Sequence, residues 1–162
     1  MKKEILELVN KGEMLPLMEE FYTIQGEGYH KGTAAYFVRI GEPLTWDMTE
    51  LTRQLKAKNV QTHIETSGAY KLTGTWDWIC LSPKKLKLPT EAIYEKAHEL
   101  KMIIYNKSDF KFAEEQASKV NNNCILYLQP EWSKRDKVIP LIVDYVMQNP
   151  KWKVSLQTHK YL

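Results

Sequence analysis

Short apolar runs alternate with segments of helical periodicity along most of this chain, and this alternation constrains the fold more than any other feature. Strands are expected over 17–24, 35–40, 62–65, 76–81, 102–105, 124–128 and 152–156, and helices over about 47–59, from 90, from 109 and over 138–149, with Asp47 and Asp109 as N-caps. Strands that alternate with helices form parallel sheets with the helices outside and right-handed crossovers. We therefore predict an α/β domain. Periodicity alone does not distinguish an open sheet from a partial barrel.

Two of these segments carry more specific expectations. The run 35–40 is short and apolar, which is typical of a strand that is covered on both faces. A helix is expected to begin near Thr90 and to place Ile93, Ala97 and Leu100 on one face.

The size and composition of the chain exclude several classes of protein. A chain of 162 residues with 43% hydrophobic content forms one domain around one core. Its net charge of +3 suits an anionic small molecule or a weak nucleic-acid contact, and by itself it does not indicate a nucleic-acid-binding protein. Charged residues interrupt the first apolar run, so it is no signal peptide, and no stretch approaches the roughly 20 apolar residues of a membrane span. We expect a cytoplasmic protein that contacts no membrane and no nucleic acid directly.

The two cysteines, Cys80 and Cys124, lie inside apolar strand-like runs. This position is typical of buried, reduced thiols in a cytosolic protein. The sequence contains no Cys-x-x-Cys or His-Glu-x-x-His motif, and neither cysteine has another within metal-ligand spacing. Spacing therefore predicts neither an iron–sulfur nor a zinc ligand set.

Polar clusters follow most of the expected strands. Ligands of parallel α/β proteins bind beyond the carboxyl ends of the strands, so these clusters are candidate site residues. They are 65–68, 82–85, 106–108, 129–132 and 157–160. Each cluster alone, like Gln25–Gly28, is explained as well by turn chemistry, although a Trp at 132 is unusual for a plain turn. Together they predict a site for a polar, partly charged ligand.

Taken in order, several segments resemble those of the 7-carboxy-7-deazaguanine synthases, a family of radical S-adenosylmethionine (SAM) enzymes. They are Glu20–Gly28, Phe37–Ile40, Gly41–Leu44, Glu65–Gly68, Ile79–Lys85, Ile103–Lys107 and Gln157–Lys160. The resemblance extends from Glu20 to Leu162 and is specific as a combination, although no single piece is. It implies one radical-SAM-like domain over 1–162, with an N-terminal extension and substrate loop over 1–34. Residues 35–162 would form a partial (β/α) barrel with a parallel sheet and outer helices.

The resemblance also implies an activity. The family converts 6-carboxy-5,6,7,8-tetrahydropterin to 7-carboxy-7-deazaguanine, a lyase-type ring contraction in queuosine and deazapurine biosynthesis that leads to tRNA modification. A reduced [4Fe–4S] cluster cleaves SAM, and the resulting radical abstracts a hydrogen atom from the substrate. The family further uses Mg²⁺. The implied protein is a cytoplasmic homodimer that needs an electron donor for its cluster.

Binding roles follow from the resemblance residue by residue. Ile24, Gln25 and Gly26 would hold the pterin substrate, and the guanidinium of Arg39 would pair with the substrate carboxylate. The residues that would line the SAM site are Gly41, Glu42, Ser67, Ser82, Pro83, Lys84, Gln129, Pro130, Glu131 and Trp132. The resemblance assigns no catalytic residue and no metal ligand to the residues of this chain.

The resemblance is interrupted at one junction, between Ile40 and Glu42. The family carries a cysteine-rich loop, a helix and a strand there, including the cluster ligands and a magnesium-binding threonine. It also carries a C-terminal tail beyond Leu162. An internal parallel strand is paired on both edges, and its loss should cost more than the roughly 5–15 kcal/mol that stabilises a domain. Because the other elements keep their pattern, we expect the molecule to contain the junction segment.

Two other functions remain open from the sequence. A chain that truly lacks the segment could be a cluster-less pterin- or nucleotide-binding protein without catalysis. A structural or RNA-associated module is the least favoured, because the sequence has no basic run and no RNA-binding motif.

Overall fold

The computed structural model describes residues 3–11, 13–40 and 46–161. The helices are α1 (Lys3–Asn10), α2 (Thr49–Ala57), α3 (Glu91–Tyr94), α4 (Asp109–Ala117) and α5 (Arg135–Gln148), with 3₁₀ turns η1 (Trp132–Lys134) and η2 (Thr158–Lys160). The strands are β1 (Leu17–Ile24), β2 (Ala34–Ile40), β3 (His63–Thr66), β4 (Trp78–Leu81), β5 (Glu99–Ile104), β6 (Ile125–Pro130) and β7 (Trp152–Val154).

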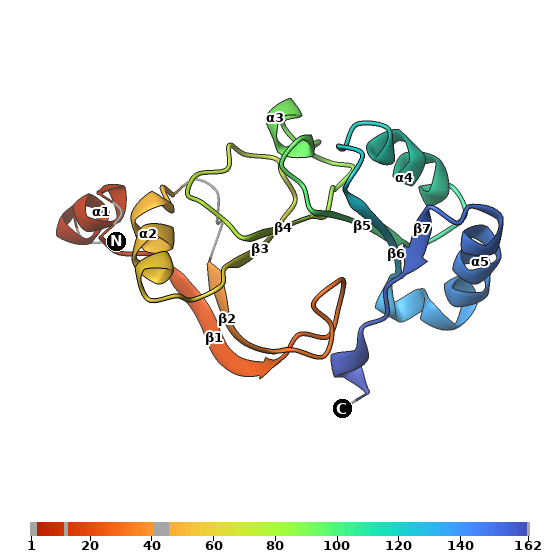
Figure 1. The fold of residues 1–162 in the computed structure, drawn as a ribbon, viewed down its shortest axis with the longest axis horizontal. Coiled ribbons are helices and arrows are strands. Elements are labelled where there is room, and N and C mark those ends of the chain that lie inside the picture. The colour runs from red at the N-terminus through yellow and green to blue at the C-terminus, as the bar shows by residue number, and fades with distance from the viewer. Residues whose placement is uncertain (1–2, 12, 41–45, 162) are drawn as a thin grey trace.

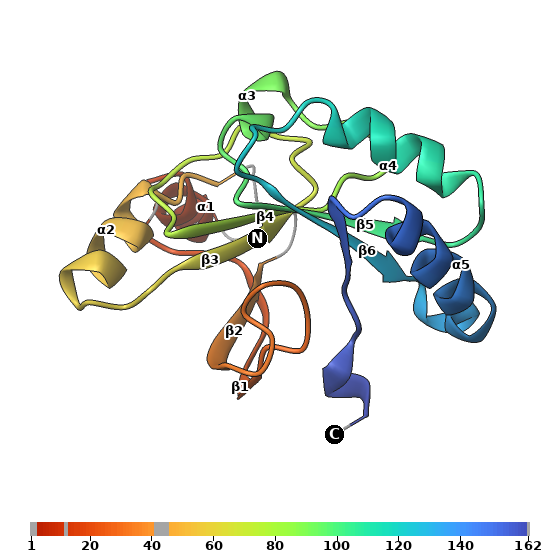
Figure 2. The ribbon, with the colours of Figure 1, turned by 45° about the vertical axis from the view of Figure 1, so that its right-hand side comes forward.

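Strands β3 to β7 form one parallel sheet in which the spatial order is the order along the chain. The sheet curves, and α3, α4 and α5 cover its outer face (Figures 1 and 2). Leu81, Leu100 and Leu128, one from each of three neighbouring strands, are completely buried in the core cluster. The predicted α/β fold with a parallel sheet and outer helices is confirmed, and its curvature is that of a partial barrel.

The opposite, concave face of the sheet carries charged side chains. Leu100, Met102 and Ile104 of β5 lie in the core cluster. Because successive side chains of a strand point to opposite faces, Glu99 and Lys101 face the concave side. Both are nevertheless buried, because the loop between β1 and β2 folds over this face (Figure 1).

Strand β2 differs from the sequence-based expectation. It pairs antiparallel with β1, and most of its side chains are exposed or half-buried, so the prediction of a strand covered on both faces is wrong. Phe21 stacks on Phe37 with ring centroids 5.3 Å apart, but Tyr22, Tyr36 and Val38 are more than half exposed. In the part of the chain that the structure describes, β2 forms no ladder with β3. Each of these two strands therefore has a free edge.

The segment that follows Thr90 also differs from its prediction. Helix α3 is a single turn, and Leu100 belongs to β5, where it pairs with Leu81 of β4 and Leu126 of β6. Ile93 and Leu100 do lie in the same core, so the expectation that both face it is confirmed, although they do not share one helix. It is built by a helical turn followed by a strand, because pairing on both edges of β5 outweighs helical periodicity.

The two expected N-caps bind backbone groups, but not at the cap position. Asp47 lies one residue before the N-cap of α2 and accepts from the amide (2.9 Å) and hydroxyl (2.6 Å) of Thr49. Asp109 is the first residue of α4 and accepts from the amides of Tyr105 (2.7 Å) and Asn106 (2.9 Å). Asp109 therefore fixes the loop before its helix. No helix within the described ranges has the length and apolarity needed to cross a membrane.

Candidate functional site

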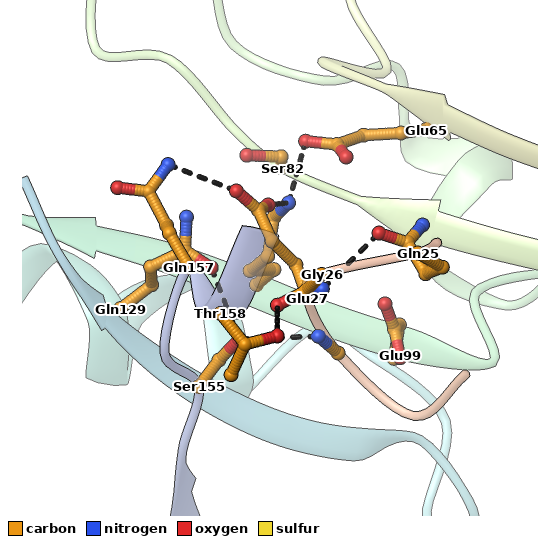
Figure 3. Close-up of polar contacts among 12 residues, drawn as sticks. Gln25, Gly26, Glu27, Glu65, Ser82, Glu99, Gln129, Ser155, Gln157 and Thr158 are labelled. Carbon is orange, nitrogen blue, oxygen red and sulfur yellow. Dashed lines mark hydrogen bonds and ion pairs between the residues drawn. The ribbon is translucent and has the colours of Figure 1, made fainter. Parts of the chain in front are cut away.

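The loop between β1 and β2 is the central element of the site. The Gln25 amide donates to the Thr33 carbonyl (2.8 Å), and the Gly32 amide donates to the Gln25 carbonyl (2.8 Å), which closes the loop. The side-chain oxygen of Gln25 accepts from the amide of Glu27 at 3.1 Å. These bonds present residues 26–28 to the concave face of the sheet (Figure 3).

The C-terminal segment after β7 holds this loop from the other side. The Gly26 carbonyl accepts from the amide (3.0 Å) and hydroxyl (2.9 Å) of Thr158. The side-chain Nε2 of Gln157 donates to Glu27 Oε1 at 2.9 Å (Figure 3). A Cβ at position 26 would lie 2.1 Å from Nδ1 of His159, so the close approach of the two segments requires glycine there. The loop and the C-terminal segment thus form one wall of the site.

A buried hydrogen-bond chain continues from the loop into the sheet. The Gly28 amide donates to the Ser155 hydroxyl at 3.1 Å, and that hydroxyl donates to Gln129 Oε1 at 3.0 Å. Ser155 and Gln129 are both buried. The sheet therefore fixes the position of the loop backbone.

Lys101 of β5 is the charged centre of the site. Its side chain is 3% exposed, and its ammonium pairs with Glu27 of the loop and, at 2.8 Å, with Oε1 of Glu65 near the end of β3. Burial opposes protonation of Lys101, but Cys80, Glu65 and Glu27 outweigh it and raise its pKa above the ordinary value. Lys101 is therefore a permanent cation that joins the loop to two strands of the sheet.

The pKa of Glu27 is shifted by its ion pair with Lys101. Burial by itself would raise the pKa of Glu27. The charge of Lys101, together with hydrogen bonds from Lys101, Gln157 and Gln129, outweighs burial and holds that pKa below its ordinary value. Glu27 is therefore a carboxylate at neutral pH.

Aromatic and ionisable side chains of the sheet contact the loop. The Tyr29 ring stacks on Trp78 with centroids 4.6 Å apart, and its amide donates to Glu99 Oε2 at 2.9 Å. Burial raises the pKa of the Cys80 thiol. Burial, with the nearby charges of His30, Lys101 and His98, lowers the pKa of His63 to about 4.

The predicted substrate residues divide into two groups. Ile24, Gln25 and Gly26 lie at the start of the loop and border the site. Arg39 lies five residues beyond Ala34 on β2, roughly 17 Å along the strand at about 3.4 Å per residue. Its exposed guanidinium pairs with Glu19 at 2.6 Å. The structure therefore brings Arg39 to Glu19 and not to the loop, and the four substrate roles stay predictions.

The predicted SAM residues lie at one end of the sheet, where its parallel strands terminate. Gly41 and Glu42 lie outside the described residues. Ser67, Ser82, Pro83, Lys84, Gln129, Pro130, Glu131 and Trp132 are at or just beyond the carboxyl ends of β3, β4 and β6. The Lys84 ammonium donates to the Ser82 hydroxyl at 3.2 Å, and Trp132 packs its ring 4.4 Å from the Arg135 guanidinium. Their position at the same end of the sheet agrees with a common site, and their roles stay predictions.

The residues present do not fit an iron–sulfur cluster. Such a cluster is held by several thiolates, commonly four. The chain has two cysteines, one in β4 and one directly before β6. Strand β5 lies between them, so two strand spacings of about 4.8 Å keep the thiols roughly 10 Å apart. Cys80 and Cys124 therefore cannot ligate one cluster together.

Sequence reasoning missed the residues that hold the site together. Glu27 was assigned to a flexible turn, and Lys101 and Ser155 were not considered. A charged pair at alternating positions, Glu99 and Lys101, inside an apolar run was the available signal, because it marks a strand with one polar face.

The chain has relatives among known proteins, although no family model matches it. The chain is 60% identical over 204 aligned positions to the 7-carboxy-7-deazaguanine synthase of Flavobacterium psychrophilum, covering 99% of this chain and 97% of the relative. It is 37% identical over 192 positions to the Synechocystis synthase, with 91% and 92% covered. The alignment of 204 positions is longer than this 162-residue chain, so the Flavobacterium relative has residues without a counterpart here.

A solved structure agrees with the fold. The crystal structure of QueE from Escherichia coli matches with a TM-score of 0.82 at 20% identity, covering 97% of this chain and 99% of that chain. At this identity the match supports the fold alone. With the two near-full-length relatives, it leads to one conclusion: this chain belongs to the 7-carboxy-7-deazaguanine synthase family.

Proposed function

We propose that the protein is a radical-SAM lyase that converts 6-carboxy-5,6,7,8-tetrahydropterin to 7-carboxy-7-deazaguanine, in the pathway to queuosine. The observation that carries this proposal is the 60% identity to the Flavobacterium synthase over 99% of the chain. The end of β1 and the loop 25–33 would bind the pterin through Ile24, Gln25 and Gly26, and Arg39 would bind its carboxylate. The buried Lys101 holds that loop on the sheet.

The activity requires a segment between β2 and α2 that the 162 residues lack. Three observations support its existence: the relative has additional residues, β2 and β3 each have an edge that no described strand pairs with, and the two cysteines do not fit a cluster. A strand in this segment would fill the space between the edges, and its loop would supply the cluster ligands. A cluster held there would supply the electron for SAM cleavage.

The other components follow from the same proposal. The residues at the carboxyl ends of the strands, Ser67, Ser82–Lys84 and Gln129–Trp132, would bind SAM. Mg²⁺ would be held by the added segment. An electron donor would reduce the cluster. The exposed apolar side chains of the β1–β2 hairpin are compatible with a homodimer. We place this enzyme in the cytoplasm.

The decisive experiment compares two chains after anaerobic treatment with iron and sulfide. One is the 162-residue chain, and the other carries the corresponding segment of the Flavobacterium relative between β2 and α2. We expect a cluster absorption band, SAM cleavage and product by mass spectrometry from the second chain alone. SAM cleavage without product would contradict the proposed substrate.

The 162-residue chain tests the remaining alternatives. If it forms product, the segment is not required and that part of the proposal is wrong. If it binds the tetrahydropterin tightly while the extended chain makes no product, the protein is a cluster-less binding protein. Binding is measured by calorimetry under nitrogen, because tetrahydropterins oxidise in air.

A further inference from the structure

Three potential metal ligands meet beneath the substrate loop. They are His63 of β3, Cys80 of β4 and Glu99 of β5, and one ligand atom from each lies within 4.8 Å of the other two. The three strands are adjacent in the sheet, and Cys80 is in register with Glu99. Because each ligand comes from a different strand, no spacing motif in the sequence reveals the set.

The buried carboxyl group of Glu99 has no cationic partner among the residues that the structure describes. Its residue is 2% exposed, and its Oε2 accepts from the amide of Tyr29 at 2.9 Å. Within the described part of the chain, no lysine or arginine lies at ion-pair distance from Glu99, since Lys101 is paired with Glu27 and Glu65. Buried carboxylates are normally paired with a charge or bound to a metal ion, and otherwise they take up a proton.

Two imidazoles beside it each have a ring nitrogen without a hydrogen-bond partner among the described residues. The Nε2 atoms of His30 and His63 are both buried, and in the described ranges neither has a partner. Their ring centroids are 5.4 Å apart, and His30 belongs to the loop that covers the site. Buried polar atoms of this kind call for a water or an ion that satisfies them.

We propose that His63, Cys80 and Glu99 bind a divalent transition-metal ion of the zinc class, with His30 as the fourth ligand. Histidine, thiolate and carboxylate are the ligands that Zn²⁺ prefers, and four of them complete a tetrahedral site. The Cys80 thiol releases its proton to solvent on binding, so thiolate and carboxylate together neutralise the ion. The Tyr29 amide remains bonded to Glu99 and orients it. The ion fastens the loop to the sheet and is independent of the proposed cluster.

Cobalt provides a direct test, because a Co²⁺–thiolate bond gives a near-ultraviolet charge-transfer band. The 162-residue protein is freed of metal with a chelator and titrated with Co²⁺. We expect one equivalent to bind with this band, Zn²⁺ to displace it, and Zn²⁺ to raise the melting temperature. Absence of Co²⁺ binding by the unmodified protein overturns the proposal.

Matched variants identify the ligands. Cys80→Ser should lose the band, whereas Cys124→Ser, the control at the other cysteine, should keep it. His63→Gln should weaken Co²⁺ binding at least tenfold, in line with the effect of losing a metal contact. Because His63 is only half-buried, this variant remains informative if Cys80→Ser fails to fold. A band that survives Cys80→Ser, or unchanged affinity in His63→Gln, contradicts the assignment.

Discussion

The buried ammonium of Lys101 donates to the carboxylate of Glu27, which joins the middle of β5 to a loop 74 positions earlier in the chain. Glu65 accepts from the same ammonium at 2.8 Å. One cation thus connects the proposed substrate loop, a central strand and the edge strand β3. Its removal leaves two carboxylates without their cationic partner, and the Glu27 side chain is only 15% exposed.

Lys101→Met should therefore destabilise the protein strongly. Breaking a buried ion pair by removing one partner costs about 3–5 kcal/mol, and we expect the lower figure because Glu65 is half exposed. Urea unfolding followed by circular dichroism measures the change. Lys153→Met, an exposed lysine on β7, is the control and should change stability by less than about 0.5 kcal/mol. Equal losses in the two variants would contradict the central role of Lys101.

The lowered pKa of Glu27 predicts a pH dependence of stability. A carboxyl whose pKa is lower in the folded than in the unfolded state contributes stability above the unfolded value of 4.5. That contribution is lost as the pH falls from 4.5 through the folded pKa. Urea unfolding between neutral pH and pH 3 should therefore show a smaller loss for Glu27→Gln than for the unmodified protein. The exposed control Glu91→Gln should follow the unmodified protein throughout.

Gly26→Ala should displace the loop from the C-terminal segment. The new Cβ would lie 2.1 Å from Nδ1 and 2.7 Å from Cβ of His159, and overpacking of this kind costs about 1–3 kcal/mol. Amide exchange of Thr158 should accelerate, because its bond to the Gly26 carbonyl is broken. His159→Gly removes both clashing atoms and should restore much of the loss in the double variant. Additive effects of the two changes would show that the contact is not the cause.

The free edge that β3 has among the described strands allows the position of the added segment to be tested. Among the described residues β3 pairs with β4 and no other strand, so its amides that point away from β4 should exchange rapidly with solvent in the 162-residue chain. In the chain that carries the Flavobacterium segment, a new neighbouring strand should slow their exchange at least tenfold. Amides of β5, which is paired on both edges, serve as the internal control. Unchanged exchange in β3 would show that the segment lies elsewhere.

The sheet was predictable from the sequence because its strands are apolar runs separated by helices or turns. The core of β5 and β6 depends on this local pattern, and the prediction located both strands within a few residues. Leu100 was misplaced because its strand partners, Leu81 and Leu126, are distant in sequence, and only pairing with them shows that it is extended. The exposure of β2 was unpredictable for the same reason, since an apolar run does not reveal which strands pair with it, and in the described part of the chain β2 pairs with β1.

The site was predictable only in outline. The polar residues at the strand ends were found, because a parallel sheet brings those ends together. The ion pair of Lys101 with Glu27 and the cluster of His63, Cys80 and Glu99 were not found. Both depend on which face of each strand points inward and on where a distant loop lies. Neither is a property of local sequence.

The order of the strands has a consequence for how the molecule assembles during synthesis. Each strand from β3 to β7 is added beside the one made before it, so the sheet can grow outward as the chain leaves the ribosome, through contacts between near neighbours. The loop, in contrast, is made early and pairs with Lys101 of the sheet, but its last anchor is Gln157, which lies 130 positions later and donates to Glu27. The wall that the loop forms with the C-terminal segment is thus the last part of the site to assemble. A ribosome that stalls near the end would release a sheet with its helices in place and a loop that Lys101 holds without the C-terminal segment.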